Sequence, residues 1–171
     1  MHSTYSDLSL NDLKAFYKRV EAITSALEVK HTDRLKCQKG CHACCLDDLE
    51  VFGIEAALIE SENQAFLKQE KPHLIGKCAF LNHEGACRIY EQRPFVCRTH
   101  GLPISWLEET EGEIFEYRDI CELNEAGEPL ENLNSKDLLQ LPSLDEQLAI
   151  IQLKADGGNG HRVKLRELFR P

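Results

Sequence analysis

The sequence has few aromatic residues and no long apolar run. Phe, Trp and Tyr together make up 7% of the 171 residues, so we expect a mostly aliphatic core. No stretch approaches the ~20 apolar residues that a membrane-spanning helix needs. The N-terminus, MHSTYSDLSLNDLKAFYKRVEAI, also lacks the basic and apolar segments of a secretory leader. We therefore expect a cytoplasmic protein that does not bind membranes.

Positive charge is scarce as well. The chain has 20 basic and 29 acidic residues and a net charge of -9, which repels phosphate backbones, so we expect no nucleic-acid partner. A Ser-His-Asp arrangement, a P-loop and a GxGxxG signature are all missing. The carboxylate pairs Asp47-Asp48 and Glu108-Glu109 are predicted to be solvated. The sequence therefore gives no support to the common hydrolase, nucleotide-binding and dinucleotide-binding classes.

Three segments are predicted to be helical. The first has a Ser9 cap and apolar residues at helical spacing, namely Leu13, Phe16, Tyr17, Val20, Ile23 and Leu27. The second follows a short extended piece at residues 49–52 and carries Ile54, Ala57, Leu58 and Phe66. The third, SLDEQLAIIQLKAD, is predicted to start at Ser143.

Strands are predicted between these helices. Residues 78–90, CAFLNHEGACRIY, have the pattern of two short strands around a turn at NHEG, and Arg93-Pro94 then breaks regular structure. Residues 102–120 predict a hairpin whose turn is ETEG, and an acidic loop-like segment follows at residues 124–137. The predicted fold class is a small α+β domain, cysteine-rich at its centre, over residues 1–156.

Residues 157–171 form a predicted Gly-rich hinge and basic tail. The tail interleaves basic and apolar residues, which are Arg162, Val163, Lys164, Leu165, Arg166, Leu168, Phe169 and Arg170. Two interpretations stay open. The tail folds back onto the acidic body, or residues 161–171 dock onto an acidic protein partner.

Eight cysteines are the most informative feature of the chain. Four of them lie within the nine residues CQKGCHACC, as Cys37, Cys41, Cys44 and Cys45, and the others are Cys78, Cys87, Cys97 and Cys121. A disulfide framework does not suit a reducing cytosol, and core packing does not explain four crowded thiols. Zinc and iron-sulfur sites use about four converging thiolate or imidazole ligands. All eight are candidate metal ligands, with Cys121 equally explained as a small buried residue.

The spacing allows the crowded thiols to share a surface. In a helical stretch the offsets place Cys37, Cys41 and Cys44 on one face. His42 and His100 are alternative ligands, although a hydrogen-bonded histidine is the commoner outcome. Arg93 and Arg98 are candidate hydrogen-bond donors to the thiolates, or else partners of the many carboxylates.

These motifs resemble the YkgJ-type cysteine-cluster proteins. Their pattern pairs a C-x3-C-x2-C-C or similar run with a later cysteine, a second cysteine before Ile-Tyr, and an Arg-Pro-x-x-Cys-Arg segment. Here these fall on residues 37–45, on Cys78, on Cys87 with Ile89-Tyr90, and on residues 93–98. The resemblance spans about residues 37–98 and implies chelation of zinc or iron.

The metal and the function stay open at this point. Thiolates suit zinc and iron-sulfur clusters alike. Many cysteines with few acid-base candidates favour a non-catalytic chelator with a structural or metal-holding role, so we do not expect an enzyme. The alternative is an iron-sulfur enzyme component with redox or radical-type methyl or group-transfer chemistry, which the C-x3-C-x2-C spacing of Cys37, Cys41 and Cys44 suggests. Thiol-redox chemistry at Cys44-Cys45 is disfavoured because vicinal disulfides are strained.

Overall fold

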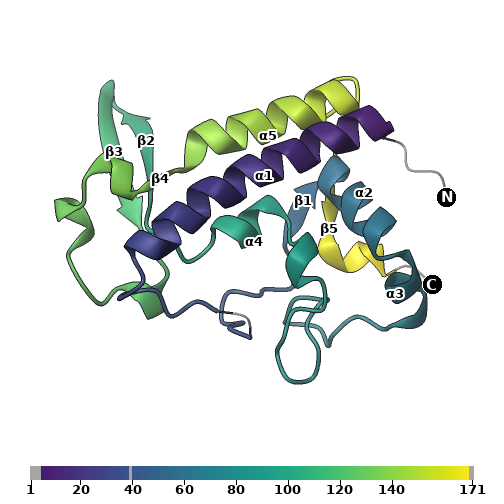
Figure 1. Ribbon diagram of the computed structural model, residues 1–171. Coiled ribbons are helices and arrows are strands. Elements are labelled where there is room, and N and C mark those ends of the chain that lie inside the picture. The colour runs from purple at the N-terminus through teal and green to yellow at the C-terminus, as the bar shows by residue number, and fades with distance from the viewer. Residues whose placement is uncertain (1–4, 39, 170–171) are drawn as a thin grey trace. The chain divides into compact units, whose positions relative to one another are not determined.

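The computed structural model describes residues 5–38 and 40–169. The chain forms two compact units, of which the first comprises residues 1–14, 38–94 and 149–171 and the second residues 15–37 and 95–148. Each unit combines helices with a small sheet (Figure 1), which confirms the α+β class. The separate folding of residues 1–156 stays a prediction.

The first helix, α1, spans Asp7–Lys30. It begins earlier than predicted, because the backbone N–H of Ser9 donates to the Ser6 hydroxyl at 3.2 Å. Ser6 therefore caps the helix, and the prediction of Ser9 was wrong. Leu13, Phe16 and Val20 are fully buried, as their spacing predicts, whereas Ile23 is 42% exposed.

In the first unit two strands from distant parts of the chain pair. Strand β1, Glu50–Phe52, runs antiparallel to β5, Arg162–Lys164, with Val51 opposite Val163. The extended piece predicted at residues 49–52 is thus confirmed. Helix α2, Gly53–Glu62, follows at once, and α3, Gln64–Gln69, comes after a break at Asn63. Helices α2 and α3 lie beside the β1–β5 pair in Figure 1.

The core of the first unit is aliphatic with a cluster of phenylalanines. Its buried members are Val51, Ala56, Ile59, Leu67, Cys78, Phe80, Leu81, Ile89, Val163, Leu165 and Leu168. Three of these come from residues 162–168, so that part of the tail is packed into this unit. The adjoining Gly-rich loop is also held, because the Asp156 carboxylate accepts hydrogen bonds from the backbone of Gly158, Asn159 and His161 at 2.9–3.1 Å.

Residues 78–90 form a turn with a single bridge in place of the predicted pair of strands. Leu81 pairs with Cys87 across it. The side chain of Asn82 accepts hydrogen bonds from the backbone N–H groups of Glu84 and Ala86, at 3.0 and 2.8 Å. These local bonds satisfy donors that a longer ladder would use, which is the usual way a short polar side chain competes with a sheet.

The second unit contains a three-stranded sheet. Helix α4, Phe95–Thr99, leads into the hairpin of β2, Ile104–Thr110, and β3, Glu113–Asp119. Strand β4, Leu139–Gln140, pairs parallel to β2. Glu111 and Gly112 take positive φ values of 55° and 83° at the hairpin tip, which confirms the predicted turn.

The last helix, α5, spans Leu141–Ala155 and contributes to both units. It begins before Ser143, whose hydroxyl donates to the carbonyl oxygen of Gln140 at 3.2 Å. The predicted start at Ser143 was wrong, because Pro142 fits the first helical turn, where its missing N–H costs nothing.

Buried polar groups in the second unit are all paired. Arg34 is 6% exposed and donates to the backbone carbonyls of Asn124, Glu125 and Glu128 at 3.0–3.2 Å. His31 contacts the Asp137 carbonyl oxygen at 2.7 Å. These bonds tie the end of α1 to the long segment that follows the hairpin.

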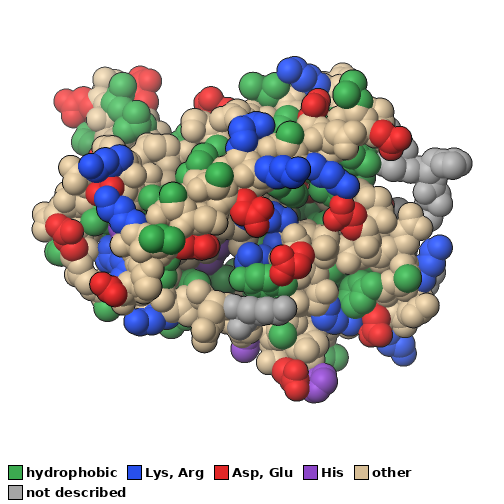
Figure 2. Space-filling model, in the orientation of Figure 1, with side chains coloured by type: hydrophobic (Ala, Val, Ile, Leu, Met, Phe, Trp, Pro, Cys, Tyr) green, Lys and Arg blue, Asp and Glu red, His purple; other side chains and the backbone are tan. Residues whose placement is uncertain are grey.

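The surface carries charges of both signs. On the face shown in Figure 2, basic and acidic side chains are interspersed, so the net charge of -9 is not gathered in one area of that face. No helix within the described ranges is long and apolar enough to cross a membrane.

Candidate metal centre

Three cysteines of the first unit meet at one edge of its core. Cys78 is buried in the core, and Cys45 and Cys87 are half-buried and pack against it. The backbone N–H of Cys78 donates to the Cys45 carbonyl oxygen at 3.0 Å, which ties the residue 37–45 run to the residue 78–87 turn. Cys44 is exposed beside Cys45.

The thiols in this group act on one another electrostatically. Burial, together with the smaller effects of the neighbouring Cys44, Cys78 and Cys87, raises the pKa of Cys45 to about 12. Burial also raises the pKa of Cys78 and of Cys87. Because charge–charge effects of this kind are short-ranged, Cys44, Cys45, Cys78 and Cys87 form one group, which we call the thiol cluster.

Basic side chains approach the thiol cluster from three parts of the first unit. Arg88 and Arg93 lower the pKa of Cys87, and Arg166 lowers the pKa of Cys78, in each case against the larger effect of burial. Arg93 was predicted near the thiolates. Arg88 and Arg166 were missed, and Arg166 had no local signal because contacts with distant parts of the chain, such as the β1–β5 pairing, bring its segment to the thiol cluster.

Arg98 has a different setting. It belongs to the second unit, where its guanidinium lies over the Tyr17 ring at 4.5 Å from the ring centroid. Its role as a donor to thiolates stays a prediction.

Cys41 and His42 lie in the same run as Cys44 and Cys45. The Cys41 N–H donates to the Gln38 carbonyl oxygen at 2.9 Å. The His42 ring packs over Gly85, where an added Cβ would fall 2.6 Å from the ring, and its Nδ1 contacts the Gly40 carbonyl oxygen at 3.2 Å. A carbonyl oxygen only accepts, so Nδ1 of His42 is the donor in this contact.

The other three cysteines belong to the second unit. Cys37 is exposed and lies against Gly101, while Cys97 sits in α4 and Cys121 precedes a short 3-10 helix, Glu122–Asn124. The sequence makes all eight cysteines candidate metal ligands and does not say whether they form one site or two. The structure divides them into five in the first unit and three in the second.

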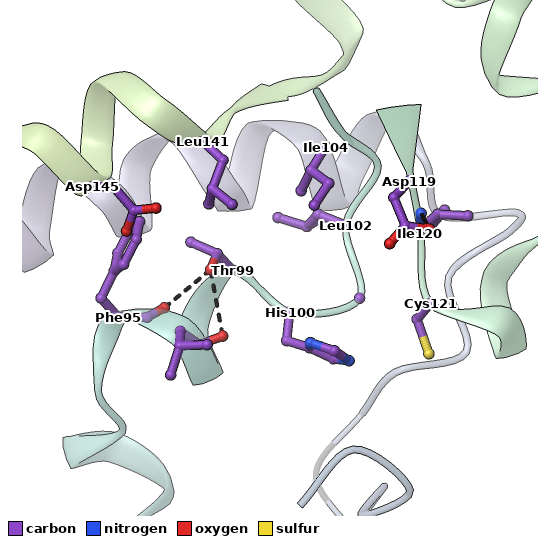
Figure 3. Close-up of a pocket in the computed structure, with 12 residues that line it drawn as sticks. Phe95, Thr99, His100, Leu102, Ile104, Asp119, Ile120, Cys121, Leu141 and Asp145 are labelled. Carbon is purple, nitrogen blue, oxygen red and sulfur yellow. Dashed lines mark hydrogen bonds between the residues drawn. The ribbon is translucent and has the colours of Figure 1, made fainter. Parts of the chain in front are cut away.

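Cys121 and His100 line a pocket in the second unit. The pocket has a volume of about 180 Å³ and apolar walls from Phe95, Leu102, Ile104, Ile120 and Leu141, with Asp119 and Asp145 adding carboxylates. In Figure 3 the His100 ring and the Cys121 sulfur lie on the side of the pocket away from Leu141. The Thr99 hydroxyl donates to the carbonyl oxygens of Phe95 and Val96 at 3.1 and 3.4 Å, so its hydrogen bonds stay within α4.

The donor set of the thiol cluster fits a metal that prefers sulfur. Four thiols beside cationic side chains provide the ligand type that zinc and iron-sulfur centres use. In residues 5–38 and 40–169, however, no three side chains of His, Cys, Asp or Glu are already arranged to hold an ion. The thiol cluster therefore supplies the ligand type of a metal centre without the geometry of a closed one.

No curated protein and no solved structure matches the chain. One family does, CxxCxxCC, described as a putative zinc- or iron-chelating domain, and it matches residues 36–125. The match extends beyond the predicted span of residues 37–98 and includes Cys121. The motif in the family name has two residues between its first two cysteines, whereas this chain has three residues between Cys37 and Cys41. Since more than half of the 171 residues are matched, the chain belongs to this family, the YkgJ-type cysteine-cluster proteins.

Proposed function

We propose that this protein holds zinc or iron through the thiolates of Cys44, Cys45, Cys78 and Cys87, and that the bound metal organises the first unit. The observation that carries the proposal is the packing of Cys45, Cys78 and Cys87 against one hydrophobic core. A metal bound there would become part of the core. It would also crosslink the residue 37–45 run to the residue 78–87 turn, which is the usual role of a closed thiolate site.

The electrostatics of the thiol cluster support a cation as its ligand. Without a cation the thiols raise one another's pKa, because neighbouring thiolates repel. A divalent ion reverses this effect and favours the thiolates, so protons are released on binding. Four thiolates on Zn²⁺ leave a charge of about -2, which Arg88, Arg93 and Arg166 would offset.

The same ligands suit an iron-sulfur cluster, which would make the protein a redox or enzyme component. A zinc protein and an iron-sulfur protein differ in metal content and in visible absorption. We expect zinc because the thiol cluster lies against the core, where a redox-silent ion held by thiolates suits a structural site. The role we propose is therefore structural or metal-holding.

The test is anaerobic purification followed by metal analysis and visible absorption. A colourless protein that contains zinc and no iron agrees with the proposal. A brown protein with iron and labile sulfide favours the enzyme component. Protein that takes up neither metal, with the same spectrum and melting temperature before and after metal addition, contradicts both.

A further inference from the structure

A fully buried asparagine contacts Cys37 in the second unit. Asn124 is 0% exposed, and its side chain makes three hydrogen bonds. Its Oδ1 accepts from the backbone N–H of Lys36 at 2.7 Å. Its Nδ2 donates to the carbonyl oxygen of Gly101 at 2.7 Å and to the Sγ of Cys37 at 3.2 Å.

The two backbone partners fix which way the amide of Asn124 points. The Lys36 N–H can only donate and the Gly101 carbonyl can only accept, so the oxygen must face Lys36 and the NH₂ group must face Gly101. The second hydrogen of that NH₂ group is the one directed at the Cys37 sulfur. The N–H···S contact thus follows from the main chain around it.

Asn124 is itself held in place by its backbone. Its N–H donates to the Cys121 carbonyl oxygen at 2.7 Å, and its carbonyl oxygen accepts from Nε of the buried Arg34 at 3.2 Å. Side-chain and main-chain bonds together join residues 34–37, Gly101 and Cys121. A buried polar network in which each member is satisfied fixes one arrangement.

Gly101 leaves the space that the Cys37 sulfur occupies. Its φ of +99° is in the range that favours glycine, and a Cβ added there would fall 2.6 Å from that sulfur. The sulfur therefore has the amide of Asn124 on one side and the bare backbone of Gly101 on another. Cys37 as a residue is nevertheless exposed, so a ligand can reach it.

We infer that Asn124 is a positioning residue, which orients the Cys37 sulfur of the second unit as a metal-binding thiolate. The inference rests on the proposed function, since it assigns a neighbour to one more thiolate of a chelating protein. An N–H donor stabilises a thiolate and restricts its rotation, as hydrogen-bonded neighbours of metal ligands do elsewhere. Neither a sequence motif nor the family description points to Asn124.

The test compares four single variants with the wild-type protein. Asn124→Ala removes all three side-chain bonds, and Asn132→Ala, an exposed asparagine in the same unit, is its control. Gly101→Ala pushes the Cys37 sulfur aside. Its control is Gly112→Ala, which has a φ of +83° but nothing within 4 Å of the added Cβ. Each zinc-loaded protein is treated with an alkylating reagent, and each cysteine is followed by mass spectrometry.

We expect zinc to protect Cys37 in the wild-type protein and both controls. In Asn124→Ala and Gly101→Ala, Cys37 should be alkylated faster, with its zinc affinity lower by about 10- to 100-fold. Protection of Cys44, Cys45, Cys78 and Cys87 should be unchanged. Equal protection of Cys37 in all five proteins, or none in the wild type, overturns the inference. If zinc protects no cysteine of the thiol cluster in the wild type, the proposed function fails instead.

A measurement on the wild-type protein avoids any dependence on how the variants fold. The side-chain amide protons of Asn124 are followed by NMR while Cd²⁺, which prefers sulfur, is added to the metal-free protein. We expect these resonances to shift with Cd²⁺ and to stay in place with Mg²⁺, which prefers oxygen. Resonances that Cd²⁺ leaves unmoved contradict the inference.

Discussion

The backbone N–H of Cys78 donates a 3.0 Å hydrogen bond to the carbonyl oxygen of Cys45. Two of the three cysteines that pack in or against the core of the first unit are thus joined through the main chain. Any ion that the two thiols share would link the same two segments. Metal binding and folding of the first unit should therefore be coupled.

Removing metal is expected to loosen the first unit. The unfolded chain has no preformed site, so an ion at 100 times its dissociation constant stabilises the folded state by about 2.7 kcal/mol. We expect a higher melting temperature with Zn²⁺ than after exhaustive chelation, and faster amide exchange around residues 44–45 and 78–89 in the chelated protein. Identical melting temperatures and exchange rates would argue against a structural metal.

Serine substitution should separate cysteines of the thiol cluster from the remaining ones. Cys45→Ser and Cys78→Ser remove proposed ligands, so zinc affinity should fall by more than the ~10- to 100-fold expected for loss of an outer partner. Cys121→Ser, in the second unit, should lower the zinc affinity less than either of these two substitutions. The measurement is competition with a chromophoric chelator. Equal losses in all three variants would contradict the assignment of ligands.

The sequence predicts the local elements of this fold well. The burial of Leu13, Phe16 and Val20 follows from the 3.6-residue period of α1, and the hairpin tip follows from a glycine that accepts positive φ. The caps were harder to predict. Ser6 and Ser9 are both suitable N-cap residues, and only the hydrogen bond from the Ser9 N–H to the Ser6 hydroxyl shows where α1 begins.

Contacts between distant segments could not be predicted from local sequence patterns in this way. The sequence predicts that Cys45, Cys78 and Cys87 bind metal, but not that five cysteines lie in one unit and three in the other. Asn124 sits in a segment that reads as an acidic loop, and Arg166 in one that reads as a tail. Their roles come from long-range pairing, which residue type and spacing do not encode.

Arg166 should contribute to stability more than other basic residues of the tail. It donates to the carbonyl oxygens of His73 and Lys77 at 2.7 and 2.8 Å and pairs with Asp47. Arg166→Ala leaves these acceptors without their charged donor, so the free energy of unfolding should fall by about 1–3 kcal/mol.

Lys164→Ala is the matched control for that variant. Its ammonium lies 3.7 Å from an Asp48 carboxylate whose side chain is 92% exposed, and such surface pairs contribute about 0–1 kcal/mol. Urea unfolding of both variants at neutral pH gives the comparison. A loss for Lys164→Ala as large as that for Arg166→Ala would show that overall charge, and not the hydrogen bonds, matters.

The Gly-rich loop after α5 should lose stability in acid. The backbone N–H of His161, followed by Gln152, Asn159 and Gly158, lowers the pKa of Asp156. A lowered pKa means that the ionised carboxylate stabilises the fold above the ordinary carboxyl pKa of about 4. This contribution is lost as the pH falls through the lower folded pKa.

Asp156→Asn should therefore be less stable than the wild type at pH 7, and the difference should shrink in acid. Asp48→Asn, at an exposed side chain, is the control and should follow the wild type. The measurement is urea unfolding across the acidic range. A difference that stays constant down to low pH would show that the ionised form of Asp156 is not what stabilises the loop.

Two glycines of the first unit allow a last test of how the thiol cluster is built. Gly85 and Gly76 have similar φ values, +82° and +97°, but differ in what surrounds them. A Cβ at Gly85 would fall 2.6 Å from the His42 ring, whereas at Gly76 it would meet nothing within 4 Å. Both alanine variants strain the backbone, at about 1–3 kcal/mol each.

Only Gly85→Ala should also displace His42 and, with it, the run that carries Cys44 and Cys45. We expect the two variants to lose similar stability in the metal-free state, but Gly85→Ala alone to bind zinc more weakly. Unfolding curves with chelator and zinc titrations of both proteins test this. Equal zinc affinity in the two variants would mean that the packing of His42 on the residue 82–86 turn has no part in positioning the thiols.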